Sequence, residues 1–259
     1  MSRRVLLTLL LAISSWLSEP TATHAATGFA TSVQNYSPGP GVSAGFDDPA
    51  RALGGPTGEG ASNGSLDILI LGVGGSVTLQ FDGSLFDGPG ADLTVFENGF
   101  SFGGGFFGEL GFVEVSTNGT DWARFDSDCN IPGPLGPFDT YDASLVQGLA
   151  GNAAVFANVL SNGIDPFDPA VSGGDAFDLT SLSTQAVVVG GLVDLMNIQF
   201  VRIVDVFGDG STLATTGNPL YDPTNPTASF DLDAIAALHL NATVAVEEKA
   251  WGSVKALYR

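Results

Sequence analysis

Short runs of alternating apolar and polar residues, separated by turns rich in glycine, proline, asparagine and aspartate, dominate the chain after its first 27 residues. The clearest alternation covers residues 113–117, in which the two valines share one face. Asn118 and Gly119 follow, and this dipeptide is the strongest short signal for a β-hairpin turn. We therefore expect a returning strand over residues 121–125.

The same pattern predicts further strands elsewhere, over residues 28–36, 66–71, 76–81, 91–97, 198–206 and 230–240. Residues 182–195 fit either a short helix or a strand. Residues 126–174 and 207–229 are rich in turn signals and predict long, ordered loops. Consecutive strands with almost no helical crossover predict an all-β fold, namely an antiparallel jelly-roll β-sandwich with long loops.

The two ends of the chain differ from this middle part. Residues 1–25 have two arginines, an apolar core and a small-residue cleavage site, which together predict a secretory signal peptide, with an uncleaved anchor as the alternative. Residues 26–245 form the predicted sandwich domain, in which no stretch is long and apolar enough to span a membrane. Residues 246–259 are basic and aromatic, and they suit a short terminal helix or a sorting or attachment segment equally well.

The charge balance excludes two classes of partner. The chain has 28 acidic and 8 basic residues, and removing residues 1–25 leaves 27 acidic against six basic ones. Nucleic acids and anionic membranes are bound through clustered Lys and Arg, so neither is an expected partner. Cys129 is the single cysteine and cannot form an internal disulfide, so the fold requires another source of stability.

Many of the acids lie in tight turns, which is the usual setting of oxygen ligands for calcium. The spacing of Asp231 and Asp233 would place both carboxylates on one face of a strand, where a cation would offset the cost of burying them. The candidate metal ligands are Asp233, Asp231, Asp175, Asp178, Glu97 and Asn98. For each acid taken singly, capping of a turn by bonds to backbone amides is the competing interpretation.

Catalytic signatures are absent from the sequence. It has no serine-nucleophile elbow, zinc-binding histidine pair or phosphate-binding loop, and His239 is the only histidine after residue 25. Paired carboxylates of a glycosidase remain possible, because such an enzyme needs only two acids near a sugar. Phenylalanines around Gly103–Gly105 suit stacking on a sugar or a protein partner, with core packing as the alternative, and the candidate ligand-binding residues are Phe106, Phe107 and Phe102.

Three segments resemble discoidin-like and carbohydrate-binding jelly-roll domains of the galactose-binding superfamily: residues 49–54 (PARALG), 113–122 (VEVSTNGTDW) and 200–203 (FVRI). That resemblance implies a two-sheet sandwich, often with a structural calcium ion, and in many members glycan binding through loops at one end.

A more specific resemblance covers nearly all of residues 26–240. Residues 91–98 (ADLTVFEN), 172–179 (SGGDAFDL) and 230–236 (FDLDAIA) are similar to a family of bacterial secreted or cell-surface proteins, many of which carry PEP-CTERM sorting tails. This second resemblance implies where the protein is located and how it folds, but it implies no activity. Residues 251–259 lack the pattern of such a tail, so attachment by that sorting system is not implied.

Together these features predict a secreted or cell-surface bacterial protein that is stabilised by calcium and is not an enzyme. Its predicted function is recognition or adhesion, with a glycan or another cell-surface macromolecule as the partner. A secreted glycan-processing enzyme that uses paired carboxylates and a structural component of a surface layer are the alternatives.

Overall fold

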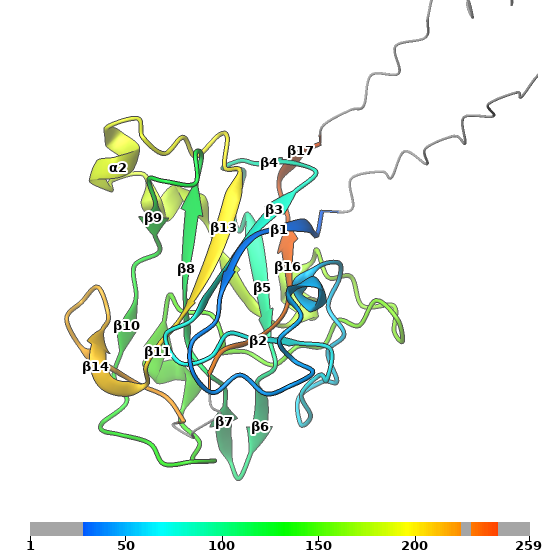
Figure 1. The fold of residues 1–259 in the computed structure, drawn as a ribbon, viewed down its shortest axis with the longest axis vertical. Helices are drawn as coiled ribbons and strands as arrows, with labels where there is room; N and C mark the ends of the chain where they lie inside the picture. Colours follow the sequence, from blue (N-terminus) through cyan, green and yellow to red (C-terminus); the bar gives the residue numbers. More distant parts are fainter. Residues whose placement is uncertain (1–27, 224–228, 243–259) are drawn as a thin grey trace, which may run out of the picture.

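The computed structural model describes residues 28–223 and 229–242 (Figure 1). The predicted signal peptide and C-terminal tail lie outside the described residues. Two antiparallel sheets form the body of the molecule, so the prediction of an all-β fold is confirmed. No helix among the described residues is long and apolar enough to cross a membrane.

The larger sheet has seven strands. Its order is β17 (Leu240–Ala242), β4 (Gly83–Leu85), β3 (Ser76–Phe81), β13 (Phe200–Asp205), β8 (Gly111–Ser116) and β9 (Ala123–Arg124), and β1 (Ala30–Ser37) also pairs with β3. The predicted hairpin after residue 117 is confirmed, because β8 and β9 pair through Val115 and Ala123. Gly119 adopts a φ of 74° in that turn, a conformation that glycine tolerates without strain.

The smaller sheet has four strands, in the order β12 (Asp175–Phe177), β5 (Leu93–Glu97), β16 (Asp231–Ala237) and β2 (Leu69–Ile70). One hydrophobic core joins both sheets, and it includes Val77, Leu79, Val113, Val115, Val201 and Ile203 from the larger sheet and Leu93, Val95, Leu232 and Ile235 from the smaller one. Burying each side chain of this size contributes roughly 1.5–3 kcal/mol. The core therefore holds the two sheets together without a disulfide bond.

Strand β16 contains an irregularity next to the predicted metal ligand Asp233. Its register against β5 shifts between Leu232 and Ala234, which leaves Asp233 as an extra, unpaired residue. After the bulge it is Ile235 that faces the shared core together with Leu232. Strict alternation along Asp231–Ala237 therefore fails, and the role of Asp231 and Asp233 as metal ligands stays a prediction.

Three two-stranded units and several short helices complete the fold. The two-stranded units are β6 (Phe100–Phe102) with β7 (Gly105–Phe107), β10 (Asp128–Cys129) with β11 (Val146–Gln147), and β14 (Asp209–Leu213) with β15 (Pro219–Tyr221). The β6–β7 hairpin projects from the end of the sandwich opposite β4 and β17 (Figure 1). The helices are η1 (Pro49–Ala52), η2 (Ala143–Leu145), α1 (Pro169–Ser172), η3 (Leu179–Leu182) and α2 (Ala186–Val189).

Aspartate side chains cap the N-termini of four of these five short helices. Asp48, Asp142, Asp168 and Asp178 each accept a hydrogen bond from the backbone N–H two residues later. Part of the acidic content of the chain is therefore accounted for by local turn chemistry, as the competing interpretation of the acids requires.

Glu114 on β8 is also accounted for structurally. Its buried carboxylate pairs with Arg124 at 2.7 Å and with Arg202. The two guanidinium groups lie in turn over the rings of Phe112 and Trp122, at 4.1 and 4.0 Å from the ring centroids. This carboxylate is neutralised by two arginines, so it is poorly suited to act as a general acid or as a metal ligand.

Candidate metal centre

Six buried or nearly buried acids lie toward the end of the sandwich from which the β6–β7 hairpin projects. They stand at or next to strand ends, and we call them the interior acidic group: Glu97, Glu109, Asp175, Asp205, Asp222 and Asp231. The antiparallel pairing of β5 with β12 and β16, and of β8 with β13, brings these strand ends to a common edge. None of the ion pairs of the described residues involves a member of this group.

Backbone amides satisfy three members of the group. Asp205 accepts from the N–H groups of Gly74 (2.8 Å) and Phe230 (2.6 Å), and Asp175 accepts from those of Gly151 and Asn152 (2.8 and 2.9 Å). Asp222 accepts from Leu110 N–H at 3.0 Å. Burial nevertheless raises the pKa of Asp175 and of Asp205 to about 7, because the amide bonds offset only part of the lost hydration.

Asp233 lies at the β16 bulge, where it borders the same narrow recess as Glu97 and Asn98. Its two oxygens accept from Thr57 N–H at 3.1 and 2.9 Å, and Oδ1 also accepts from the Thr57 hydroxyl at 3.2 Å. Burial raises its pKa to about 7. The carboxylate joins β16 to the loop at residue 57, so its hydrogen-bonding capacity is already engaged in a structural contact.

Glu97 and Asp231 differ from the other acids because each has an oxygen without a partner. Glu97 Oε2, Asp231 Oδ1 and the neighbouring Asn98 Oδ1 are buried and have no hydrogen-bond donor among the described residues. Asn98 Nδ2 contacts Asp231 Oδ2 at 3.5 Å, and the Asn98 backbone N–H donates to the Asp231 carbonyl at 3.2 Å. We call the three unpaired atoms the inner oxygen site.

The charge at the inner oxygen site is unfavourable for isolated carboxylates. Burial raises the pKa of Glu97 well above its ordinary value, and the nearby Asp231 and Asp175 carboxylates raise it further, while the backbone N–H groups of Gly99 and Asn98 lower it in part. Burial is also the main cause of the raised pKa of Glu109, followed by the charges of Asp231 and Glu97. A cation is the kind of group that would stabilise these acids in their charged form.

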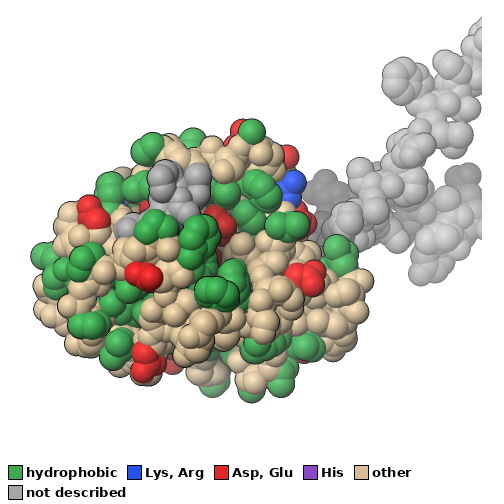
Figure 2. Space-filling view, turned by 90° about the horizontal axis from the view of Figure 1, so that it is seen from below, with side chains coloured by type: hydrophobic (Ala, Val, Ile, Leu, Met, Phe, Trp, Pro, Cys, Tyr) green, Lys and Arg blue, Asp and Glu red, His purple; other side chains and the backbone are tan. Residues whose placement is uncertain are grey.

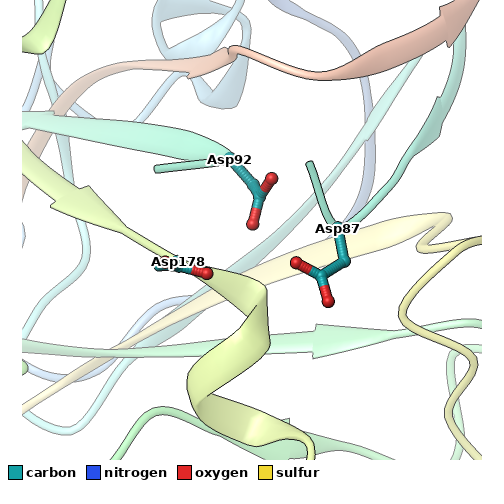
Figure 3. Close-up of side chains that lie close together, drawn as sticks. All are labelled: Asp87, Asp92 and Asp178. Carbon is teal, nitrogen blue, oxygen red and sulfur yellow. The ribbon is translucent and has the colours of Figure 1, made fainter. Parts of the chain in front are cut away.

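A second group of acids lies elsewhere, where β5 begins. The carboxylates of Asp87, Asp92 and Asp178 turn toward a common space (Figure 3), and one oxygen of each lies within 4.8 Å of the others. Among the described residues, this is the one set of acidic, histidine or cysteine side chains that meets this criterion. The outer aspartate triad, as we name it, is therefore able to hold a metal ion.

The outer aspartate triad also has an extensive set of protein partners. Asp92 is fully buried and accepts from the N–H groups of Gly88 and Leu179, both at 2.7 Å, while its Oδ1 lies 2.7 Å from His239 Nδ1. Asp178 caps η3, and Asp87 accepts from the Thr180 hydroxyl at 2.7 Å. The protein itself thus accounts for much of the geometry of the triad.

The β6–β7 hairpin carries an exposed set of aromatic rings. Phe102 is 58% exposed and Phe138, in a neighbouring loop, is 67% exposed. The Phe107 ring lies between two others, 6.2 Å from Phe138 in a stacked arrangement and 5.4 Å from Phe100. We call Phe100, Phe102, Phe107 and Phe138 the aromatic surface. Seen from this end, hydrophobic side chains alternate with polar surface and separate acidic side chains (Figure 2).

Phe106 is not part of the aromatic surface, although the sequence makes it a candidate for ligand binding. It is only 6% exposed and packs edge-on against Tyr141, with ring centroids 6.0 Å apart. Neighbouring residues on a strand point to opposite faces, so Phe107 lies outside while Phe106 anchors the hairpin from within.

Sequence reasoning missed several residues of these sites. Asp87 and Asp92 were not among the predicted ligands, whereas Asp178 was, and the three meet only through tertiary contacts. Phe138 lies more than thirty residues from the hairpin and gives no sequence signal except its place between turn residues.

Comparison with protein-family models and with curated proteins finds no match to this chain, so the function has to be argued from these sites.

Proposed function

We propose that this is a non-catalytic recognition protein, secreted or displayed on a bacterial surface, that binds a glycan on its aromatic surface. The supporting observation is a set of exposed and half-buried rings, one of which, Phe102, borders a hollow. That hollow has a volume of about 900 Å³ and is lined by residues 101–106 and 140–143. Aromatic faces suit the apolar faces of sugar rings, and nearby hydroxyl and carboxylate groups suit sugar hydroxyls.

The backbone of Phe138 supports this proposal. It is the one non-glycine residue among those described whose φ is positive, at 64°, yet its ring is exposed rather than packed in the core. Such a backbone costs on the order of 1–3 kcal/mol and tends to persist at functional sites. Stacking on Phe107 holds the Phe138 ring on the surface, where it adds to the area available for a ligand.

Calcium is the metal that we propose for the acidic sites. The oxygen atoms of carboxylates and amides are its preferred ligands. The jelly-roll topology, export by residues 1–25 and kinship with galactose-binding domains belong to the same proposal. Each of them is consistent with an all-β, acidic, disulfide-free chain.

The alternative of a glycosidase has weaker support. Such an enzyme places two carboxyl groups across an accessible sugar-binding groove. Glu97 and Glu109 are buried, and Glu114 is paired with two arginines. Asp126 and Asp128 line a second hollow, but hydrogen bonds from Thr216, Asn218 and Asn130 lower the pKa of Asp128, the opposite of what a general acid requires.

Replacing an aromatic ring should weaken glycan binding without unfolding the protein. We expect Phe107→Ala and Phe138→Ala each to weaken the binding of a glycan identified on an array by about fivefold, because one stacked ring contributes on the order of 1 kcal/mol. Affinity electrophoresis on the immobilised glycan measures this change.

Phe207→Ala is the matched control, since Phe207 is exposed but does not belong to the aromatic surface. Its retention should equal that of the parent protein. Parental retention by both Phe107→Ala and Phe138→Ala would contradict the proposed glycan surface, as would a parent that binds no glycan on the array.

A further inference from the structure

We propose that one Ca²⁺ ion binds at the inner oxygen site, between Glu97, Asn98 and Asp231, and fixes the root of the β6–β7 hairpin. This site is separate from the outer aspartate triad. The inference rests on the calcium part of the proposed function and is independent of its glycan part.

Unpaired oxygen atoms are the first argument. Of the buried polar side-chain atoms that lack a hydrogen-bond partner among the described residues, three are concentrated here: Glu97 Oε2, Asn98 Oδ1 and Asp231 Oδ1. Glu97 is only 1% exposed, so bulk water cannot hydrate its carboxylate. All three atoms are hydrogen-bond acceptors, and an acceptor left unpaired inside a protein is strongly disfavoured. A cation is the kind of group that satisfies buried acceptors of this type.

Part of the inner oxygen site borders a narrow recess. Glu97 and Asn98 line this recess together with Asp233, and its volume is about 150 Å³. Gly64 closes the recess from the loop that follows Thr57. A side chain there would place its Cβ only 2.0 Å from Asn98 Oδ1, so glycine allows the loop to approach the amide this closely.

The local charge is the third argument. No Lys or Arg of the described residues forms an ion pair with Glu97, Glu109 or Asp231. Several carboxylates therefore share a dry region without a basic counter-charge. Two carboxylates and one amide oxygen are hard ligands of the type that calcium prefers, and Glu109 is close enough to interact electrostatically with both carboxylates.

The proposed ligands Glu97 and Asn98 lie directly before the hairpin that carries the aromatic surface. Asn98 and Gly99 join β5 to β6, so an ion bound to Glu97 and Asn98 holds the hairpin at its root. The Phe106 ring packs against Gly99, where an added Cβ would lie 2.6 Å from the ring and 2.8 Å from Glu97 Oε2. Bound calcium should therefore restrain the hairpin that carries Phe102 and Phe107.

Calcium titration of the full-length, metal-free protein tests this site. We expect Glu97→Gln and Asp231→Asn to weaken calcium affinity by at least about 100-fold, the upper range for disrupting the surroundings of a bound metal. Glutamine and asparagine preserve side-chain shape and remove a buried charge, so both variants should fold in metal-free buffer. The control is Asp87→Asn combined with Asp178→Asn in the outer aspartate triad, which should retain the parental affinity for the inner site.

A second measurement follows the hairpin directly. Calcium should slow hydrogen exchange of the amides in residues 98–107 in the parent and in the control, and should leave them unchanged in Glu97→Gln. Terbium offers a check of position, because the ring of Tyr141 should sensitise its emission and Tyr141→Phe should abolish that signal without loss of calcium binding.

The outcomes separate the proposals. If Glu97→Gln and Asp231→Asn bind calcium as tightly as the parent and the triad variant does not, the inner site is wrong while calcium stabilisation survives. A parent that binds no calcium would overturn both. Glycan retention in metal-free buffer tests the glycan surface separately. If the protein retains the glycan there, a failure of either calcium proposal leaves the glycan proposal intact.

Discussion

In metal-free buffer the protein should unfold at a markedly lower temperature at pH 8 than at pH 5. Burial raises the pKa of Asp175, Asp205 and Asp233 to about 7, and it raises the pKa of Glu97 and Glu109 well above the ordinary value. A carboxyl group whose pKa is higher in the folded state binds protons more tightly there than in the unfolded chain. Its stabilising contribution is complete below pH 4 and is lost as the pH rises through about 7.

The expected size of this effect is large. A pKa shift of one unit corresponds to about 1.4 kcal/mol of stability. Each buried aspartate with a pKa near 7 should therefore lower the free energy of unfolding by on the order of 2 kcal/mol between pH 5 and pH 8. Exposed aspartates act in the opposite sense at lower pH, since hydrogen bonds lower the pKa of Asp142 and Asp209 and their contribution disappears as they protonate. The maximum of stability should therefore lie near pH 5.

Thermal unfolding across this pH range, with and without calcium, measures the effect. Calcium should raise the midpoint most at pH 8, where the carboxylates are ionised, and least at pH 5. Equal midpoints at pH 5 and pH 8 in metal-free buffer, or a higher midpoint at pH 8, would show that the buried acids do not behave as their surroundings predict.

Asp92→Ala should destabilise the protein by roughly 3–5 kcal/mol, the largest effect that we expect for a single acid. Its carboxylate is fully buried and accepts from the N–H groups of Gly88 and Leu179 while contacting His239. Removing it leaves one buried and one partly buried donor without an acceptor, and a buried unpaired group costs about 1–3 kcal/mol.

Asp87→Ala is the control from the same triad. Asp87 is only partly buried and loses one hydroxyl partner, so its substitution should cost less than about 1 kcal/mol. Urea unfolding in metal-free buffer compares the two variants. Equal losses would mean that Asp92 is no more important to the fold than its neighbour, and that its amide and histidine contacts contribute little.

The sequence predicts the strand framework well because periodicity of burial is local information. Residues 76–81 alternate as the side chains of a half-buried strand should, and β3 spans Ser76–Phe81. The short strands escape this reasoning. β10, β11 and β12 have two or three residues each, too few for any period to be visible, and β6 and β7 are separated only by Gly103 and Gly104.

The sites are less predictable because they depend on contacts between distant residues. Spacing alone pairs Asp233 with Asp231, but the hydrogen bonds of Asp233 to Thr57 at the bulge are visible only in the tertiary structure. Asp92 is buried by His239, 147 residues away, and by Leu179. A sequence identifies oxygen ligands, but only the tertiary structure reveals which oxygen atoms already have donors.

The central claim is that a divalent cation neutralises the carboxylates gathered at the hairpin end of the sandwich. Elemental analysis of the purified full-length protein, after dialysis against trace calcium at pH 8, tests it most directly. We predict at least one calcium atom per chain in the parent, and one fewer in the protein carrying both Glu97→Gln and Asp231→Asn. A parent without bound alkaline-earth metal, whose unfolding temperature is the same with and without a chelator, would contradict the account.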